Sequence, residues 1–164
     1  MKRFILLVSI FLIVAKVLFS QTMPVPINLQ CALFKKIFSY NKTLQTKGIK
    51  LAILYTDSSI KDEVVESFKQ FGLFPTLVNN NDIGNVINNF TVIYITPGCG
   101  SIKALTDKHQ VFSISGLPSL AEKSEASVAI GIESGKPKIL INKKKVESEG
   151  QELSPDLLKI AKIL

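Results

Sequence analysis

The sequence predicts a single α/β domain with a mixed, mostly parallel sheet of about six strands flanked by helices. The run at 51–55 is apolar without interruption, which is typical of a strand buried on both faces, and 91–95 is the strongest strand prediction. These runs alternate with segments of helical period, and strand–helix–strand units form parallel sheets because each return needs a crossover. Near the C-terminus, two apolar runs flank a Gly-Lys-Pro turn, which predicts an antiparallel hairpin followed by a closing helix.

The first twenty residues have the pattern of a secretory signal peptide. Lys2 and Arg3 precede a run of twelve apolar residues at 4–15, and the small residue Ser20 closes the segment. A membrane anchor needs about 18 uncharged residues, and Lys16 interrupts the run before that length is reached. We therefore expect an exported protein with a signal peptide at 1–20, an extended leader at 21–27 and one domain at 28–164.

The first helix of this domain is expected to begin at Asn28 as its N-cap and to end near Tyr40, with a loop at 41–48. Its apolar side includes Phe34, Ile37 and Phe38. Two interpretations stay open. The apolar side packs on the sheet, or Phe34, Ile37, Phe38 and Tyr40 form an exposed stripe that docks on a partner or a second copy.

The remaining elements follow from runs of apolar residues and from capping signals. Asp57–Ser59 is a candidate cap for the helix at 60–71, and Ser154 with Pro155 is typical of a helix start. Strands are expected at 51–55, 74–78, 91–95, 111–114, 128–132 and 138–141, with short helices after 82, from 101, at 119–123 and after 154.

Charge and ligand counts exclude several classes of function. The 20 basic and 13 acidic residues give a net charge of +7, and removing Lys2, Arg3 and Lys16 with the signal peptide lowers it to +4. That mild excess does not indicate nucleic-acid binding. One His and two separated Cys match no zinc spacing, and no cofactor is expected. Lys143–Lys145 and the glutamates are interpreted as solvated surface charges.

The segment Thr96–Ser101 is the best candidate ligand loop, because it follows the strongest predicted strand and opens a helix. Loops at the carboxyl ends of parallel strands bind ligands in such folds. Gly98, Cys99, Gly100 and Ser101 lack the further residues of a phosphate-binding or dinucleotide-binding loop. A tight turn and a small-ligand or anion contact remain the two interpretations.

The two cysteines, Cys31 and Cys99, have two possible fates in an exported protein. They can form a disulfide, although the sequence does not show whether their Cα atoms come within about 7 Å. Alternatively, Cys99 and His109 form a nucleophile and base. No third orienting residue is evident for such a pair, so we do not expect an enzyme.

Several segments resemble the YfiR family of small exported proteins of Gram-negative bacteria. They are Val111–Gly116, Ala129–Asn142, Leu157–Ala161 and, near the N-terminus, Leu33–Leu44. The resemblance implies a periplasmic protein without enzymatic activity that binds the periplasmic region of a membrane-bound diguanylate cyclase. It further implies repression of cyclic di-GMP signalling and biofilm formation, relief by an outer-membrane lipoprotein, and a homodimer.

This chain departs from the better-known YfiR-like proteins in its cysteines, since those proteins carry two pairs. The resemblance therefore carries over neither a disulfide nor redox control, and it places no partner-binding residue. We expect a regulator that binds the inactive conformation of its partner more tightly than the active one, with its contact surface at 34–44. The alternative is a periplasmic small-molecule binding module with its site near 96–101.

Overall fold

The computed structural model describes residues 25–56 and 60–164. The predicted signal peptide, residues 21–24 of the predicted leader and the predicted cap Asp57–Ser59 lie outside the described residues. In the part of the chain that the structure describes, no helix is both long and apolar enough to cross a membrane.

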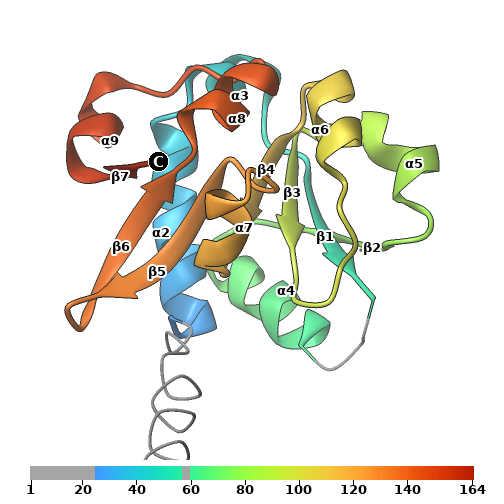
Figure 1. Cartoon of the computed structure of the whole chain (residues 1–164). Coiled ribbons are helices and arrows are strands. Elements are labelled where there is room, and N and C mark those ends of the chain that lie inside the picture. Colours follow the sequence, from blue (N-terminus) through green and yellow to red (C-terminus); the bar gives the residue numbers. More distant parts are fainter. Residues whose placement is uncertain (1–24, 57–59) are drawn as a thin grey trace, which may run out of the picture.

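The predicted α/β fold with a mostly parallel sheet is confirmed (Figure 1). The strands are β1 (Leu51–Tyr55), β2 (Thr76–Asn79), β3 (Val92–Ile95), β4 (Phe112–Ser115), β5 (Val128–Glu133), β6 (Lys136–Ile141) and β7 (Lys162–Ile163). They lie in the order β2-β1-β3-β4-β5-β6-β7, and only β5 and β6 pair antiparallel. From β1 the chain adds β2 on one side and the remaining strands on the other. The strand order therefore reverses between β1 and β3, whose carboxyl ends flank this point.

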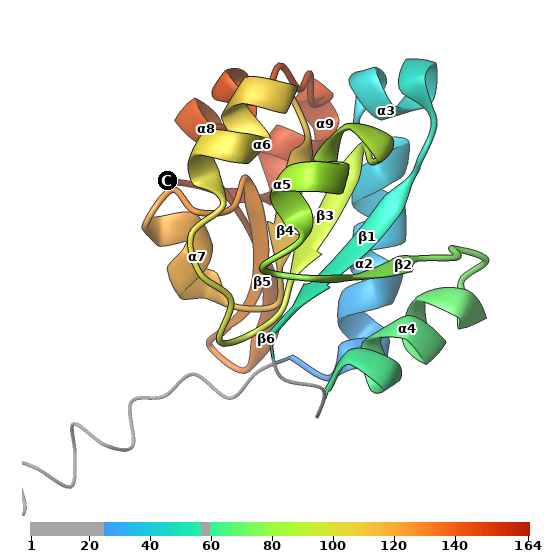
Figure 2. The ribbon, with the colours of Figure 1, turned by 90° about the vertical axis from the view of Figure 1, so that its right-hand side faces the viewer.

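Helices cover both faces of the sheet. The bounds are α2 (Ile27–Ser39), α3 (Lys42–Lys47), α4 (Lys61–Gln70), α5 (Ile83–Val86), η1 (Ile87–Asn89), α6 (Lys103–His109), α7 (Pro118–Glu122), α8 (Lys143–Ser148) and α9 (Pro155–Ile160). The buried side chains of α2, α4 and α9 share one apolar cluster with one face of the sheet. Those of α5, η1 and α7 pack on the other face, so the domain has three layers (Figure 2).

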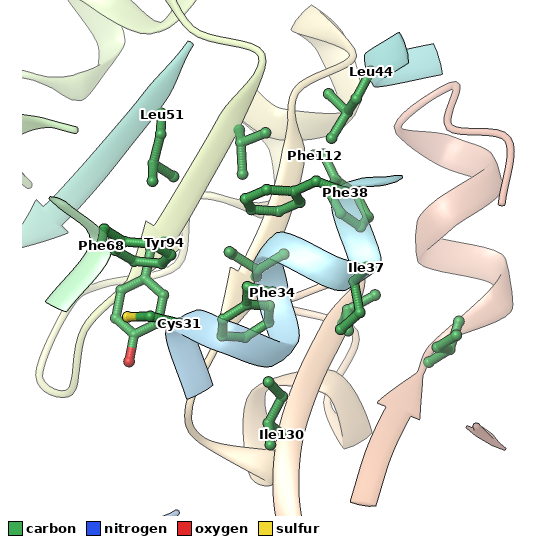
Figure 3. Packing of buried hydrophobic residues seen from close by; sticks show 14 of the residues in the cluster. Cys31, Phe34, Ile37, Phe38, Leu44, Leu51, Phe68, Tyr94, Phe112 and Ile130 are labelled. Atoms are coloured by element: carbon green, nitrogen blue, oxygen red, sulfur yellow. The ribbon is translucent and has the colours of Figure 1, made fainter. Parts of the chain in front are cut away.

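Helix α2 lies against the middle of the sheet and supplies Phe34 and Phe38, two of the largest fully buried side chains (Figure 3). Phe34, Ile37 and Phe38 are at most 2% exposed, and Phe34 meets Tyr94 of β3 edge-to-face with ring centroids 5.9 Å apart. Burying three such side chains contributes about 1.5–3 kcal/mol each. The interpretation of these residues as an exposed docking stripe is therefore wrong, because the sheet itself covers them; Tyr40, at the helix end, is half-buried.

Two local expectations also fail for tertiary reasons. Asn28 does not cap α2, which begins after Pro26; its side chain accepts a hydrogen bond of 2.6 Å from Ser67 of α4 instead. The predicted loop at 41–48 contains α3, whose N-cap Asn41 accepts a hydrogen bond from the Leu44 N–H. The Lys42 N–H donates to the Glu152 carbonyl at 2.8 Å, so this polar segment is ordered by a distant part of the chain.

The helix predicted after 154 is α9, and a short strand follows it. Helix α9 ends at Ile160, and Lys162–Ile163 then pair with β6 as a seventh strand. Ile160 and Ile163 are 55% and 44% exposed.

Candidate functional site

A cavity of about 330 Å³ lies at the carboxyl ends of the central strands, on the α2 and α4 side of the sheet. Its walls are mostly apolar. They come from the segment before α2 and its first turn, from the start of α4, and from the ends of β3 and β4. The lining residues of these walls are Val25, Pro26, Ile27 and Gln30; Ile60 and Glu63; Tyr94 and Pro97; Gly116 and Leu117.

Gln30 is the polar centre of this cavity. It is 3% exposed, its Nε2 donates to the Val25 carbonyl at 2.5 Å, and its Oε1 accepts from the Tyr94 hydroxyl at 2.8 Å. The side chain lies against Gly116, where a Cβ would stand 2.7 Å from the Gln30 Cδ. Glycine at 116 therefore makes room for the amide that joins the leader, α2 and β3.

Burial keeps the inner end of the cavity neutral. It raises the pKa of Tyr94 well above its ordinary value, with smaller contributions from Cys31 and Glu63. Burial also raises the pKa of the neighbouring Cys31 thiol to about 12. At neutral pH both groups are protonated, so Tyr94 acts as a hydrogen-bond donor and neither group is poised to transfer a proton.

Glu63, in the first turn of α4, is the one charged group among the described lining residues and is exposed. A carboxylate at the mouth of an apolar cavity suits a ligand that has an apolar body and a cationic or donor group at one end.

The predicted ligand loop Thr96–Ser101 lies beside this cavity but does not form it. Thr96 Oγ1 and Cys99 Sγ both donate to the Leu54 carbonyl, at 2.8 and 3.4 Å. Gly98 has a φ of +85°, which favours glycine, and Ser101 Oγ donates to Glu125 at 2.5 Å. These contacts match the tight-turn interpretation.

None of Gly98, Cys99, Gly100 and Ser101 lines the cavity; Pro97, within the same segment, does. The cavity thus lies at the same edge of the sheet as the predicted ligand loop, but on the other face. A sequence gives no signal for this difference, because it depends on which side of the strand ends the helices leave open.

Cys31 and Cys99 are free thiols. Cys31 is buried in the cluster beneath α2, whereas Cys99 packs on the cluster of the opposite face. The disulfide interpretation is therefore wrong, because the sheet lies between the two sulfurs. Figure 3 shows the Cys31 sulfur next to Tyr94.

The proposed pair of Cys99 and His109 is not brought together either. His109 is the last residue of α6, and a helix of this length puts roughly 10 Å between its ends. Cys99 precedes the helix start, so the two residues lie toward opposite ends of the strands that α6 connects. Among the described residues, no group of three or more His, Cys, Asp or Glu side chains is placed to hold a metal ion.

A buried ionic cluster was missed by the sequence analysis. Glu149 is fully buried and accepts from Ser113 N–H at 2.9 Å, Ser113 Oγ at 2.6 Å and Ser127 Oγ at 2.5 Å. Lys145 Nζ, also buried, lies 3.2 Å from Glu149 and 2.7 Å from Asp107 Oδ1. The expectation that these charges are solvated is wrong for Lys145 and Glu149.

This cluster, called the α6–α8 joint below, links parts of the fold and has no features of a ligand site. Lys145 donates further hydrogen bonds to Thr106 Oγ1 at 2.7 Å and to the Lys103 carbonyl at 3.2 Å, so every donor of the ammonium has a partner. Such satisfied buried pairs fix one arrangement of the elements they join. Here they hold α8 against α6 and the amino ends of β4 and β5.

Comparisons with known proteins bear on the fold. No family model matches the chain, and no curated protein matches it. Among solved structures, an ABC domain in complex with L-Trp from Streptococcus pneumonia is similar with a TM-score of 0.60 at 14% identity, over 85% of this chain and 60% of that chain. A conserved domain protein from Vibrio cholerae is similar with a TM-score of 0.60 at 14% identity, over 84% and 60%.

The chain thus spans about 60% of the length of both solved structures. At this level of identity the likeness shows the α/β fold alone.

Proposed function

We propose that the protein is an exported, non-enzymatic module that binds a small molecule in the cavity at the carboxyl ends of β3 and β4. The observation that carries this proposal is the apolar cavity itself, with Gln30 and Tyr94 at its inner end and Glu63 at its mouth. Its volume of about 330 Å³ falls within the range of ligand sites, and open α/β sheets bind ligands outside the carboxyl ends of their strands.

The walls select the class of ligand. An apolar body fits Ile27, Ile60 and Leu117, while a cationic group fits the exposed carboxylate of Glu63. A molecule of the size of an aromatic amino acid or amine meets both conditions. The similar ABC domain whose structure contains L-Trp supports this choice of first ligand.

The composition of the chain makes the test direct. The chain has no tryptophan, so indole fluorescence reports on an added ligand alone. We expect L-tryptophan or tryptamine to show a blue-shifted emission that saturates with protein concentration, because burial moves the indole out of water.

Two variants on α2 provide a matched pair. Ile27→Glu places a charge in the cavity wall and should weaken binding at least tenfold, since an unpaired charge in an apolar site is costly. Leu29→Glu, two residues on and 39% exposed outside the cavity lining, should bind as the unchanged protein does. Equal affinities for the two variants, or no retained or added ligand of this class by native mass spectrometry, would contradict the proposal.

A second candidate is the YfiR-type function, repression of a membrane-bound diguanylate cyclase through its periplasmic part. The observation that favours a protein partner is Phe74, which is 80% exposed beside a hollow of about 480 Å³ that also includes Ile49 and Phe90. Exposed apolar side chains around a hollow are typical of interaction surfaces. The buried residues of α2 no longer supply this surface.

In-cell cross-linking of the tagged protein tests the second candidate. Capture of an inner-membrane protein with a cytoplasmic cyclase domain, lost with Phe74→Ser but kept with Ile160→Ser at the far end of the chain, is the expected result. Capture that is unchanged by Phe74→Ser would show that this surface is not the one used. An outer-membrane lipoprotein in the same eluate would add the relief step that the family resemblance implies.

A further inference from the structure

Among the residues that the structure describes, β2 pairs only with β1, and its outer edge is left without a partner strand. Figure 2 shows β2 in front of the sheet with no ribbon across it, and Thr76 and Leu77 are both exposed although they point to opposite faces. No charged residue occurs between Gly72 and Asn81. Natural proteins usually place charges on such an edge, because its free N–H and C=O groups accept another strand.

The hydrogen bonds of β2 show which backbone groups face outward. The Asn80 N–H donates to the Tyr55 carbonyl at 2.8 Å, so the even-numbered residues of β2 face β1. Because backbone groups alternate along a strand, Leu77 presents both its N–H and its C=O outward, and Asn79 presents its N–H. Pro75, just before the strand, presents a C=O and has no N–H.

One carbonyl of this edge is already used. Asn79 C=O accepts the Asp82 N–H at 3.0 Å in the turn after β2. The outward edge therefore offers two donors, on Leu77 and Asn79, and two free acceptors, on Leu77 and Pro75.

This pattern is complementary to itself. In an antiparallel pair centred on Leu77, each Leu77 N–H meets the Leu77 C=O of the other copy. Each Asn79 N–H then meets the other copy's Pro75 C=O. Pro75 has no N–H to offer the Asn79 C=O of the other copy, and that carbonyl needs none because it already accepts the Asp82 N–H of its own chain. Every outward donor of the strand finds an acceptor, and no free acceptor is left over.

We propose that the β2 edge pairs with the β2 edge of a second copy of this chain, in an antiparallel register centred on Leu77, and so joins two sheets into one across a two-fold axis. This goes beyond small-molecule binding and uses none of the cavity residues. Charge favours this edge for self-association, because the chain is net positive and two copies meet here without like charges opposite each other. The two Leu77 side chains lie on the same face and shield each other from water.

The contact is small, so the dimer should be weak and should form only at high protein concentration. Sedimentation velocity of the purified protein from about 10 µM to 1 mM should show a rising dimer fraction. Leu77→Lys puts two like charges opposite each other and should weaken association about tenfold or more. The matched control is Ile163→Lys, which adds the same charge to the other sheet edge and should leave association unchanged.

Disulfide trapping tests the register in a Cys99→Ser background. Residues in a hydrogen-bonded antiparallel pair have Cα atoms about 5.5 Å apart, which suits a disulfide. Leu77→Cys should therefore cross-link to its own counterpart under mild oxidation, whereas Thr76→Cys, which lies opposite Val78, should not. Circular dichroism shows whether each variant is folded.

A protein that stays monomeric at 1 mM, a dimer that survives Leu77→Lys, or dissociation by Ile163→Lys would each overturn the proposal. Equal cross-linking of Leu77→Cys and Thr76→Cys would overturn the register. These variants lie outside the cavity, so L-tryptophan binding can be measured on the same samples. A failure of the ligand-binding proposal is therefore distinguishable from a failure of the dimer proposal.

Discussion

Gln30 joins three parts of the chain that are far apart in the sequence. Its amide holds the Val25 carbonyl and the Tyr94 hydroxyl, and it occupies the space next to Gly116. A buried amide is stable in this position because both of its polar atoms have partners. The position of Gln30 at the inner end of the cavity therefore requires glycine at 116.

Gly116→Ala should destabilise the protein by about 1–3 kcal/mol, because the added methyl group pushes Gln30 away from its partners and leaves buried polar atoms unpaired. Urea unfolding measures this change. Gly84→Ala, in α5, is the control: no atom lies within 4 Å of its added Cβ, and alanine favours helix over glycine by about 0.5–1 kcal/mol. A Gly116→Ala variant as stable as the unchanged protein would show that Gln30 has room to move.

At the scale of elements, the α6–α8 joint depends on Asp107. Burial alone would raise its pKa, but hydrogen bonds from Lys145, Ser148 and Lys103 outweigh burial and lower the pKa from 3.8 to about 2. The carboxylate is 27% exposed, so solvent screens part of this interaction. Asp107 thus accepts two of the hydrogen bonds from α8, beside those that Lys145 donates to Thr106 and to the Lys103 carbonyl.

This pKa shift gives the stability of the α6–α8 joint a pH dependence. A carboxyl group with a lowered pKa in the folded state stabilises the protein above its unfolded pKa, and this contribution is lost as the pH falls toward about 2. Asp107→Asn should lower the urea midpoint at pH 7, and the difference from the unchanged protein should shrink between about pH 4 and pH 2.

Asp156→Asn is the control, since Asp156 makes an exposed ion pair with Lys159 in which both side chains are 74% exposed; such pairs contribute little. A difference for Asp107→Asn that is constant with pH would contradict the assigned charge state.

At the scale of the whole molecule, the sheet separates two apolar clusters, with Cys31 in one and Cys99 against the other. Cys31 is fully buried with a pKa raised to about 12, whereas Cys99 is half-buried at the end of β3. A buried neutral thiol is unreactive, because the thiolate is the nucleophile.

A thiol reagent at pH 8 should therefore modify Cys99 in the folded protein and reach Cys31 only after urea is added. Cys99→Ser should abolish the native reaction, and Cys31→Ser should leave it unchanged. If the oxidised protein contained a Cys31–Cys99 disulfide, neither thiol would react, and the separation of the thiols between the two apolar clusters would be wrong.

The order of strands along the sheet also belongs to this scale. Crossovers on both faces of the sheet put β2 at one edge and β7 at the other. The proposed ligand site and the proposed dimer edge thus lie in different parts of the molecule, so that ligand binding and self-association are open to separate measurement.

The sequence by itself determined the fold class and the positions of the main strands. The runs at 51–55 and 92–95 are apolar throughout because both faces of β1 and β3 are covered, and that condition is visible residue by residue. The hairpin of β5 and β6 was equally local, since its turn at 134–135 lies between two apolar runs.

Only the tertiary structure decided which polar side chains are buried and where the cavity opens. Lys145 and Glu149 look like solvated charges in the sequence, but partners more than twenty residues away enclose them. Helix α3 is polar throughout except Leu44 and is ordered by the segment around Glu152. A local pattern of apolar residues indicates which side chains are buried. Which polar side chains are buried with them depends on partners that the packing of the whole chain brings close.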